Sequence, residues 1–302
     1  MTFDTTTAKQ DGAAMAGRIS EALDCLAAEN PVHASFIKAL KGLMVARSEL
    51  AESLELPDFK DSLLKDRALF LQGSPLIPKG KLPMDTALLK ACAAKLTPVL
   101  AETFPAQAEA LRALGAAFAS GKMRLKARVK ALAASGALPD KPALRAAGST
   151  PEAAGLLLGQ IVKTIAEGVA ARVRASADLS GWTKGYCPVC GSPPEISYLE
   201  GQEGKRMLSC SLCATTWRFT RVACPSCETD KHDQIEIFYA EDKPKERAEA
   251  CNACKRYVLS VDRRERAREL VPSVEPLALM HLDIIMQERG YTPASGESAV
   301  TG

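Results

Sequence analysis

Four Cys-x-x-Cys pairs within 68 residues constrain this chain more than any other feature. Two cysteines separated by two residues can bind one metal ion together, and a tetrahedral all-thiolate site needs two such pairs. The pattern predicts two four-cysteine metal sites. The eight expected ligands are Cys187, Cys190, Cys210, Cys213, Cys224, Cys227, Cys251 and Cys254.

Loop lengths favour pairing of the cysteine pairs in chain order. The first and second pairs are separated by 19 residues and the third and fourth by 23, which is enough for two strands and a turn. Only 10 residues separate the two halves, which suits a single strand that carries Trp217 from one metal lobe to the next. A cross-braced arrangement, with the first pair joined to the third, stays open at this point.

The identity of the metal also stays open. Tetrahedral sulfur ligation suits zinc and iron alike. Zinc would only stabilise the fold, whereas rubredoxin-like iron could change its oxidation state. A closed four-thiolate site has no open position for water or substrate, so we do not expect hydrolytic metal catalysis.

Composition describes an ordinary soluble protein. The 302 residues are 47% hydrophobic and 25% charged, with a net charge of +3, which does not by itself indicate binding to nucleic acid or to an anionic membrane. Neither a secretory signal nor a membrane span is expected, so we predict a cytoplasmic protein. In a reducing cytosol, clustered cysteines are more often metal ligands than disulfides. The sequence leaves the oligomeric state open.

The N-terminal part, residues 1–180, reads as an all-α domain. Helices are expected near 15–28, 33–54, 60–70, 84–101, 106–120, 122–134 and 151–176, because Ala and Leu dominate and apolar residues recur every three or four positions. The proline-rich stretch 71–83 is expected to be a loop, with a second break at 136–150.

Residues 181–271 are predicted to form a β-rich tandem module that resembles rubredoxins and zinc ribbons, with two metal lobes. Strands are expected at 195–200, 205–209, 215–222, 234–240 and 255–261, with a hairpin turn at 201–204. Residues 272–302 should form a helix at 277–289 and a disordered tail after Tyr291. Of the residues that follow the cysteine pairs only Gly191 is a glycine, whereas Ala214, Glu228 and Lys255 predict a less regular turn geometry.

Other candidate groups have less specific roles. Trp217 and Arg221 could contact a protein partner, although for Trp217 a role in covering the two metal lobes is favoured. The arginine run at 263–268 is interrupted by acidic residues, so a solvated helix start is favoured over a nucleic-acid contact. The chain has three histidines, none of them in a catalytic pattern. Cys25 and Cys92 are expected to be small buried fillers.

Taken together, the cysteine motifs resemble one family. Four motifs and a closing segment are similar to the FdhE-type formate dehydrogenase accessory proteins. They are Cys187-Pro-Val-Cys190-Gly191, 208–213 with Trp217 and Arg221, Cys224-x-x-Cys227, 250–257 and the closing segment 275–291. The resemblance covers residues 180–292.

The resemblance implies a cytoplasmic maturation factor. It would bind the catalytic subunit of respiratory formate dehydrogenases and be needed for the activity of that enzyme without being an enzyme itself. The resemblance implies rubredoxin-type iron in the cysteine sites, while zinc stays possible. The alternatives are a rubredoxin-like electron-transfer protein and a nucleic-acid-binding zinc ribbon.

Overall fold

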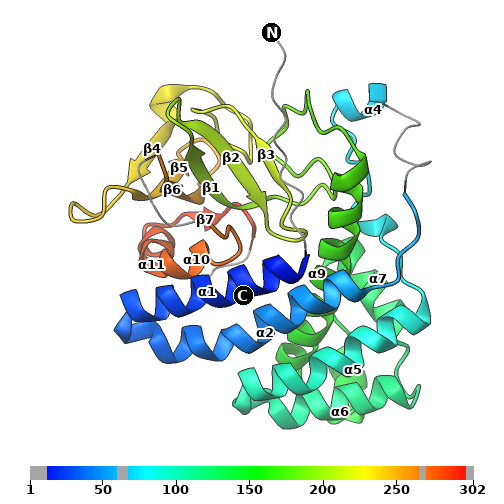
Figure 1. The fold of residues 1–302 in the computed structure, drawn as a ribbon. Helices are drawn as coiled ribbons and strands as arrows, with labels where there is room; N and C mark the ends of the chain where they lie inside the picture. Colours follow the sequence, from blue (N-terminus) through cyan, green and yellow to red (C-terminus); the bar gives the residue numbers. More distant parts are fainter. Residues whose placement is uncertain (1–11, 60–66, 265–269, 297–302) are drawn as a thin grey trace.

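The computed structural model describes residues 12–59, 67–264 and 270–296. A helical part and a β-rich part lie side by side (Figure 1). The helices are α1 (Gly12–Glu29), α2 (Ala34–Ser53), α4 (Arg67–Leu71), α5 (Thr86–Thr103), α6 (Ala108–Ala119), α7 (Leu125–Ser135), α8 (Lys141–Ala146) and α9 (Pro151–Ser176). Single 3-10 turns lie at Pro31–His33, Lys79–Lys81 and Pro105–Gln107. The predicted helical character of this part is confirmed, although most of the helix expected at 60–70 lies outside the described residues.

Helix α9 is the central helix of the core. It begins as predicted, because Thr150 caps it by accepting the N–H of Ala153 and Pro151 follows at its first turn. Among the described helices, it alone is long and apolar enough to cross a membrane by length and composition. Two thirds of its most apolar window, 67%, is buried inside the protein, as in the core helix of a globular fold.

The break expected at 136–150 contains the short helix α8. Asp140 caps it, since its carboxylate accepts the N–H of Ala143 at 2.8 Å, and Pro142 occupies its first turn. Both are ordinary helix-start signals, so the prediction of an uninterrupted break was wrong.

One seven-stranded sheet carries both metal lobes. Its order is β3-β2-β1-β6-β5-β4, with β7 beside β6. The strands are β1 (Pro194–Glu200), β2 (Lys205–Cys210), β3 (Thr216–Arg218), β4 (Ile235–Phe238), β5 (Glu246–Cys251), β6 (Arg256–Asp262) and β7 (Thr292–Pro293). The β-rich module and the 201–204 hairpin turn are confirmed. Strand β3 is shorter than the expected 215–222, and β5 was not expected.

The two lobes repeat one plan. In each lobe a Cys-x-x-Cys turn precedes the first strand, a second such turn follows the second strand, and a third strand completes an antiparallel unit. The first lobe is β1-β2-β3 and the second is β4-β5-β6. Parallel pairing of β1 with β6 joins the lobes, as in the pair Ile196 and Leu259.

The C-terminal segment closes the second lobe. Helices α10 (Glu275–Ala278) and α11 (Met280–Glu288) form the predicted terminal helix in two pieces, and α11 packs on β5 and β6. Tyr257 of β6 donates its hydroxyl to Asp283 of α11, and both residues are buried. The disorder expected after Tyr291 is wrong for Thr292 and Pro293, which pair with β6.

The largest hydrophobic core crosses the expected boundary at residue 180. It contains Leu158 and Ile161 of α9 together with Trp182, Leu208 and Trp217 of the β-rich part. A second cluster joins α1 to Val271 and Val274 of the segment before α10. The division into domains 1–180, 181–271 and 272–302 therefore stays a prediction, and residues from different predicted domains pack in the same hydrophobic cores.

Candidate metal centre

The eight sulfur atoms form two quartets in chain order. Site one consists of Cys187, Cys190, Cys210 and Cys213, and site two consists of Cys224, Cys227, Cys251 and Cys254. Within each quartet all sulfur atoms lie within 4.8 Å of one another. The cross-braced alternative is not the arrangement of this structure.

Sulfur–sulfur distances match the edges of a metal tetrahedron. Two pairs in site one are 3.5 and 3.4 Å apart, and two pairs in site two are 3.6 and 3.7 Å apart. Metal–sulfur bonds of about 2.3 Å at tetrahedral angles give edges of about 3.8 Å. The donor set and its spacing therefore fit one zinc or iron ion in each quartet.

All four Cys-x-x-Cys turns are followed by a residue in the left-handed backbone region. The residue after each pair has a positive φ, namely 77° at Gly191, 53° at Ala214, 57° at Glu228 and 57° at Lys255. In three of the turns its N–H donates to the carbonyl of the first cysteine at 2.8–2.9 Å. The less regular geometry expected at Glu228 and Lys255 was wrong, because the turn imposes a left-handed conformation that side chains adopt only at a cost.

These turns direct backbone N–H groups at sulfur. In both turns of site one, the second and third residues after the first cysteine donate to its Sγ at 3.4–3.5 Å. In site two, Ser226 donates to Cys224 at 3.4 Å. Such hydrogen bonds stabilise negative charge on sulfur, which favours the thiolate that a metal requires.

The charge balance of site one calls for a cation. Burial raises the pKa of Cys187 and of Cys210 well above the ordinary range. Hydrogen bonds from Cys187 and from the other thiols lower the pKa of Cys190. The protein alone therefore disfavours negative charge on Cys187 and Cys210, because thiolates in a buried site of low polarity are poorly solvated and repel one another. A bound metal ion would supply the positive charge that these thiolates need.

Site one is enclosed. Its four cysteines are at most 2% exposed and belong to the large core cluster. The segment before the Lys79–Lys81 turn forms a cover over the first Cys-x-x-Cys turn: Leu76 donates to Pro188, Ile77 to Val189 and Lys79 to Cys190 at 2.8–3.2 Å. We call residues 76–79 the cover segment. The 71–83 stretch is a loop as predicted, but its contact with a metal turn was not foreseen.

Helix α9 also reaches site one. Thr215 is fully buried, and its Oγ1 lies 3.2 Å from Cys213 Sγ. Arg174 of α9 donates to the same oxygen at 3.2 Å. The orientation of this hydroxyl beside the sulfur therefore depends on the helical part of the protein.

Site two is open to solvent on one side. Cys224 and Cys251 are buried at 3% and 1%, whereas Cys227 is exposed and Cys254 is half-buried. The two quartets thus differ in access, since solvent or a second molecule can reach sulfur only in site two.

Two close contacts hold the lobes together. Gly185, just before site one, lies so near Pro225 that an added Cβ would be 2.0 Å from the Pro225 carbonyl oxygen. Its N–H donates to Glu228 Oε1 at 2.9 Å. The sequence did not predict the contact of Gly185 with Pro225 or with Glu228, because a contact between distant segments leaves no recognisable pattern in a single sequence.

A buried arginine forms the second connection. Arg206 of β2 is 2% exposed and forms an ion pair with Glu249 of β5. Its Nη1 donates to the carbonyl oxygens of Thr220 and Ala223, at 3.0 and 2.7 Å, in the segment between the two sites. Removal of one partner from a buried pair costs about 3–5 kcal/mol, so Arg206 is a major determinant of how the lobes are placed.

Trp217 is buried. It is 4% exposed, and its Nε1 donates to the carbonyl of Lys184 at 3.1 Å. This placement favours the covering role, and a contact of Trp217 with a partner stays a prediction. Arg221 is exposed, with one hydrogen bond to the carbonyl of Glu203 at 3.4 Å, and its role in partner binding stays a prediction.

The remaining candidates lie away from the quartets. Cys92 is buried as predicted, and burial raises its pKa to about 11, whereas Cys25 is exposed and was wrongly expected to be buried. Most of the 263–268 run lies outside the described residues; Arg264 within it pairs with Asp262. The nearest ion-pair partner of His281 is Glu246 at 3.7 Å.

Comparisons with known proteins converge on one family. The family models described as the central domain and the C-terminal domain of FdhE match residues 186–221 and 208–299. An FdhE homologue of Aquifex aeolicus is 35% identical over 113 residues, which are 36% of this chain and 40% of that protein. The FdhE protein of Escherichia coli is 33% identical over 118 residues, 38% of this chain and 37% of that one. These matches thus span less than half of either relative.

A solved structure extends the similarity to almost the whole chain. The crystal structure of the FdhE protein from Pseudomonas aeruginosa aligns with a TM-score of 0.66 and 25% sequence identity, covering 94% of both chains. The helical part, whose sequence lies outside the matched family models, therefore shares the arrangement of that protein.

Proposed function

We propose that this chain is a member of the FdhE family, a cytoplasmic accessory factor that binds the catalytic subunit of a respiratory formate dehydrogenase and is required for its activity. The family name connects the chain with formate dehydrogenase. The observation that carries the proposal is the pair of sulfur quartets within a fold that aligns with an FdhE structure over 94% of its length.

The eight cysteines are proposed to hold two resident ions, one per quartet. Four sulfurs leave no coordination position for a substrate, which supports a binding or maturation role over catalysis at the metal. Site one, enclosed by the cover segment and the core, would stabilise the fold. A structural four-thiolate ion contributes on the order of 10 kcal/mol to folding.

A direct binding experiment tests the proposal. We expect the tagged protein to retain a metal-free or cofactor-free formate dehydrogenase catalytic subunit, and a strain lacking the protein to lose formate dehydrogenase activity. A C210S variant should lose site one and the retained subunit, whereas C25S, which changes an exposed cysteine outside both quartets, should keep both. Full enzyme activity in the deletion strain, together with no retention of the subunit, would refute the proposal.

Electron transfer is the second candidate function, because site two exposes Cys227. An exposed thiolate ligand brings a partner close to the ion, as a rubredoxin-like exchange of one electron requires. Iron in site two would give a visible thiolate-to-iron absorption that a mild reductant bleaches. Protein purified without oxygen that contains zinc in both quartets would exclude this role.

A further inference from the structure

The open edge of the sheet lies in the second lobe. Strands β3 and β4 are the two ends of the sheet order, and β3 lies toward the helical part, whereas β4 lies at the far side (Figure 1). In the described part of the chain β4 pairs with β5 and with no other strand. An unpaired strand edge is a template for the backbone of another chain.

The ladder geometry identifies the groups on that edge. Asn252 N–H donates to the carbonyl of Gln234 at 2.8 Å, which makes Ile235 and Cys251 a non-hydrogen-bonded pair. The backbone groups of Glu236 and Phe238 therefore face β5, and those of Ile237 face the open edge. A short extended segment could accept and donate hydrogen bonds there.

Side chains along this edge are apolar on one face. Ile237 is 51% exposed and Tyr239 is 55% exposed. Phe238 points the other way, where it contacts the ring of Tyr291 and the guanidinium of Arg289. The outer face of β4 thus offers contact area to alternate residues of an added strand.

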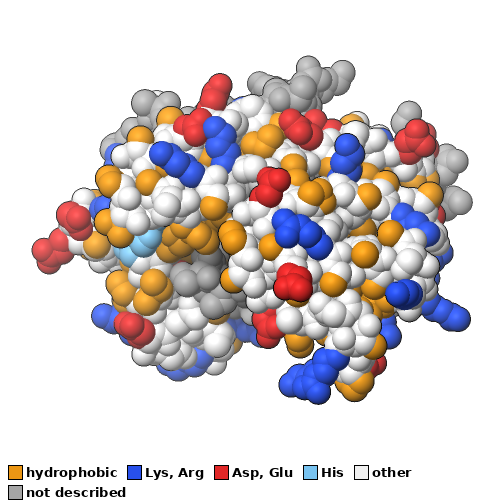
Figure 2. Space-filling model, turned by 90° about the horizontal axis from the view of Figure 1, so that it is seen from below, with side chains coloured by type: hydrophobic (Ala, Val, Ile, Leu, Met, Phe, Trp, Pro, Cys, Tyr) orange, Lys and Arg blue, Asp and Glu red, His pale blue; other side chains and the backbone are white. Residues whose placement is uncertain are grey.

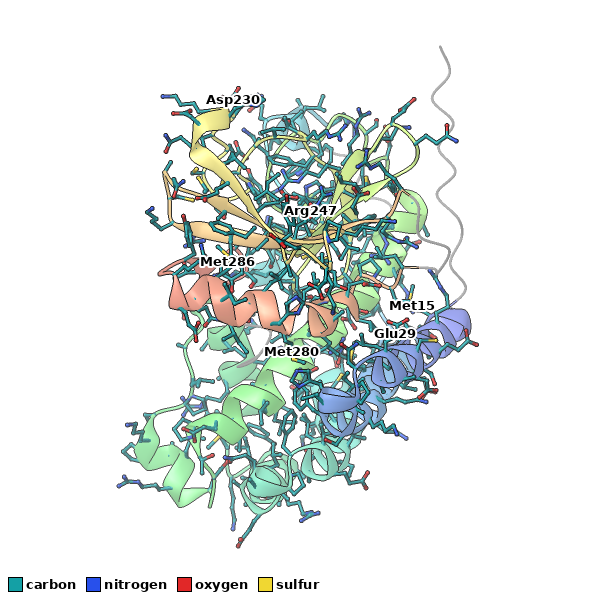
Figure 3. All side chains as sticks on the ribbon, turned by 90° about the vertical axis from the view of Figure 1, so that its left-hand side faces the viewer. Met15, Glu29, Asp230, Arg247, Met280 and Met286 are labelled. Carbon is teal, nitrogen blue, oxygen red and sulfur yellow. The ribbon has the colours of Figure 1, made fainter. Side chains whose placement is uncertain are left out.

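The negative charge around the β4 edge favours a positively charged segment as its ligand. Residues 230–242 contain five carboxylates, one lysine and one histidine. None of the five forms an ion pair with a residue that the structure describes; they are Asp230, Asp233, Glu236, Glu241 and Asp242. Asp230 lies at the end of the second lobe farthest from α1, and acidic side chains project from the left-hand tip of the molecule (Figures 2 and 3). Four thiolates around an ion add negative charge nearby.

We propose that the open edge of β4, in the lobe that holds site two, binds an extended, basic segment of a protein by strand addition. The inference deepens the proposed function and rests on it, since the segment belongs to the protein that this factor binds. Backbone pairing with Ile237 supplies the register, the outer face takes apolar side chains, and the five carboxylates favour Lys and Arg on the segment.

A defined peptide tests this site without knowledge of the partner. The probe is a fluorescein-labelled Lys-Val-Lys-Val-Lys-Val peptide, measured by anisotropy against the full metal-loaded chain. We expect saturable binding that weakens as salt rises. A Glu-Val repeat of equal length should bind at least tenfold more weakly. The lysine peptide N-methylated at its two central residues should also bind at least tenfold more weakly. The N–H groups of two successive residues point to opposite edges of a strand, so one of the two methyl groups removes a hydrogen bond to β4.

Two protein variants locate the binding. Ile237→Pro removes an N–H that faces the open edge and should weaken peptide binding about tenfold without loss of metal, since proline is tolerated at such positions. The double change Asp233→Lys and Glu236→Lys should abolish the salt dependence. A matched control, Glu102→Lys with Glu109→Lys on α5 and α6, changes the net charge equally and should leave binding unchanged.

The outcomes separate this inference from the proposed function. Absence of binding up to ~1 mM peptide, equal binding of the N-methylated peptide, or equal loss in the control variant would overturn the strand-addition site. Peptide binding that the two variants weaken, in a protein that does not retain the formate dehydrogenase subunit, would uphold the edge as a site and refute the proposed partner.

Discussion

Replacement of Gly185 by alanine tests whether the contact between the two metal lobes is tight. Its φ is not in the left-handed region, so alanine adds no backbone strain of its own. The new Cβ would lie 2.0 Å from the Pro225 carbonyl oxygen and 2.6 Å from its carbon. Because both atoms are backbone, the turn that contains Pro225 must retreat by about 1.4 Å to reach an ordinary contact of about 3.4 Å.

The expected loss follows from two effects. Overpacking of a tight contact costs typically about 1–3 kcal/mol. The same shift breaks the hydrogen bond from Gly185 to the Glu228 carboxylate, worth roughly 1.5–3 kcal/mol for a charged acceptor and less here because Glu228 is partly exposed. We therefore expect Gly185→Ala to lower the free energy of unfolding by about 2–5 kcal/mol.

Urea unfolding followed by circular dichroism measures this change. Gly159→Ala is the matched control, because nothing lies within 4 Å of its added Cβ and it sits inside helix α9, where alanine should stabilise by about 0.5–1 kcal/mol. A Gly185→Ala protein as stable as the wild type, within about 0.5 kcal/mol, would show that the lobes are not in contact as described.

Three further predictions concern the turns, the ions and the ion pair of Asp262 with Arg264. Ala214→Gly should stabilise the protein by about 0.5–1 kcal/mol in the same assay, because φ is 53° there; a lower urea midpoint would contradict this. A chromogenic chelator should remove one ion per chain quickly, from the site that exposes Cys227, and the second slowly; release of both at one rate would show that access does not differ. Asp262→Asn should cost up to about 2 kcal/mol at pH 7. The hydrogen bond from Arg264 lowers the pKa of Asp262 to about 2. The difference between variant and wild type should thus persist above about pH 3.8 and vanish as the pH falls through about 2; a difference that does not change with pH would refute it.

The parts predicted well were those with local signals. Helix α9 has a cap, an N-terminal proline and one apolar stripe, so its bounds match at both ends. The quartets follow from loop length, since each pair of cysteines in a quartet is separated by two strands. Strand β5 was missed because Ala248 and Ala250, two of its three buried residues, have little intrinsic preference for strands. Pairing with β4 and β6 makes the segment a strand.

The parts missed depend on contacts between distant residues. The left-handed residues Ala214 and Glu228 go against intrinsic preference, and the turn around the sulfurs overrides it. The contact of Gly185 with Pro225 and the ion pair of Arg206 with Glu249 join segments about 40 residues apart. A single sequence does not distinguish a glycine or an arginine that makes such a contact from one that does not.

The cover segment has a consequence for how the protein is made. Residues 76–79 leave the ribosome more than a hundred residues before the first cysteine pair, which at cellular rates is roughly 5–20 s. The helices around residues 76–79 can fold in that interval. We therefore expect the cover segment to be in place when Cys187 and Cys190 emerge from the ribosome. Strand β7, which pairs with β6 beside site two, is synthesised only after all eight cysteines. Pulse labelling of stalled nascent chains with a thiol reagent should therefore find the first quartet protected before the last one.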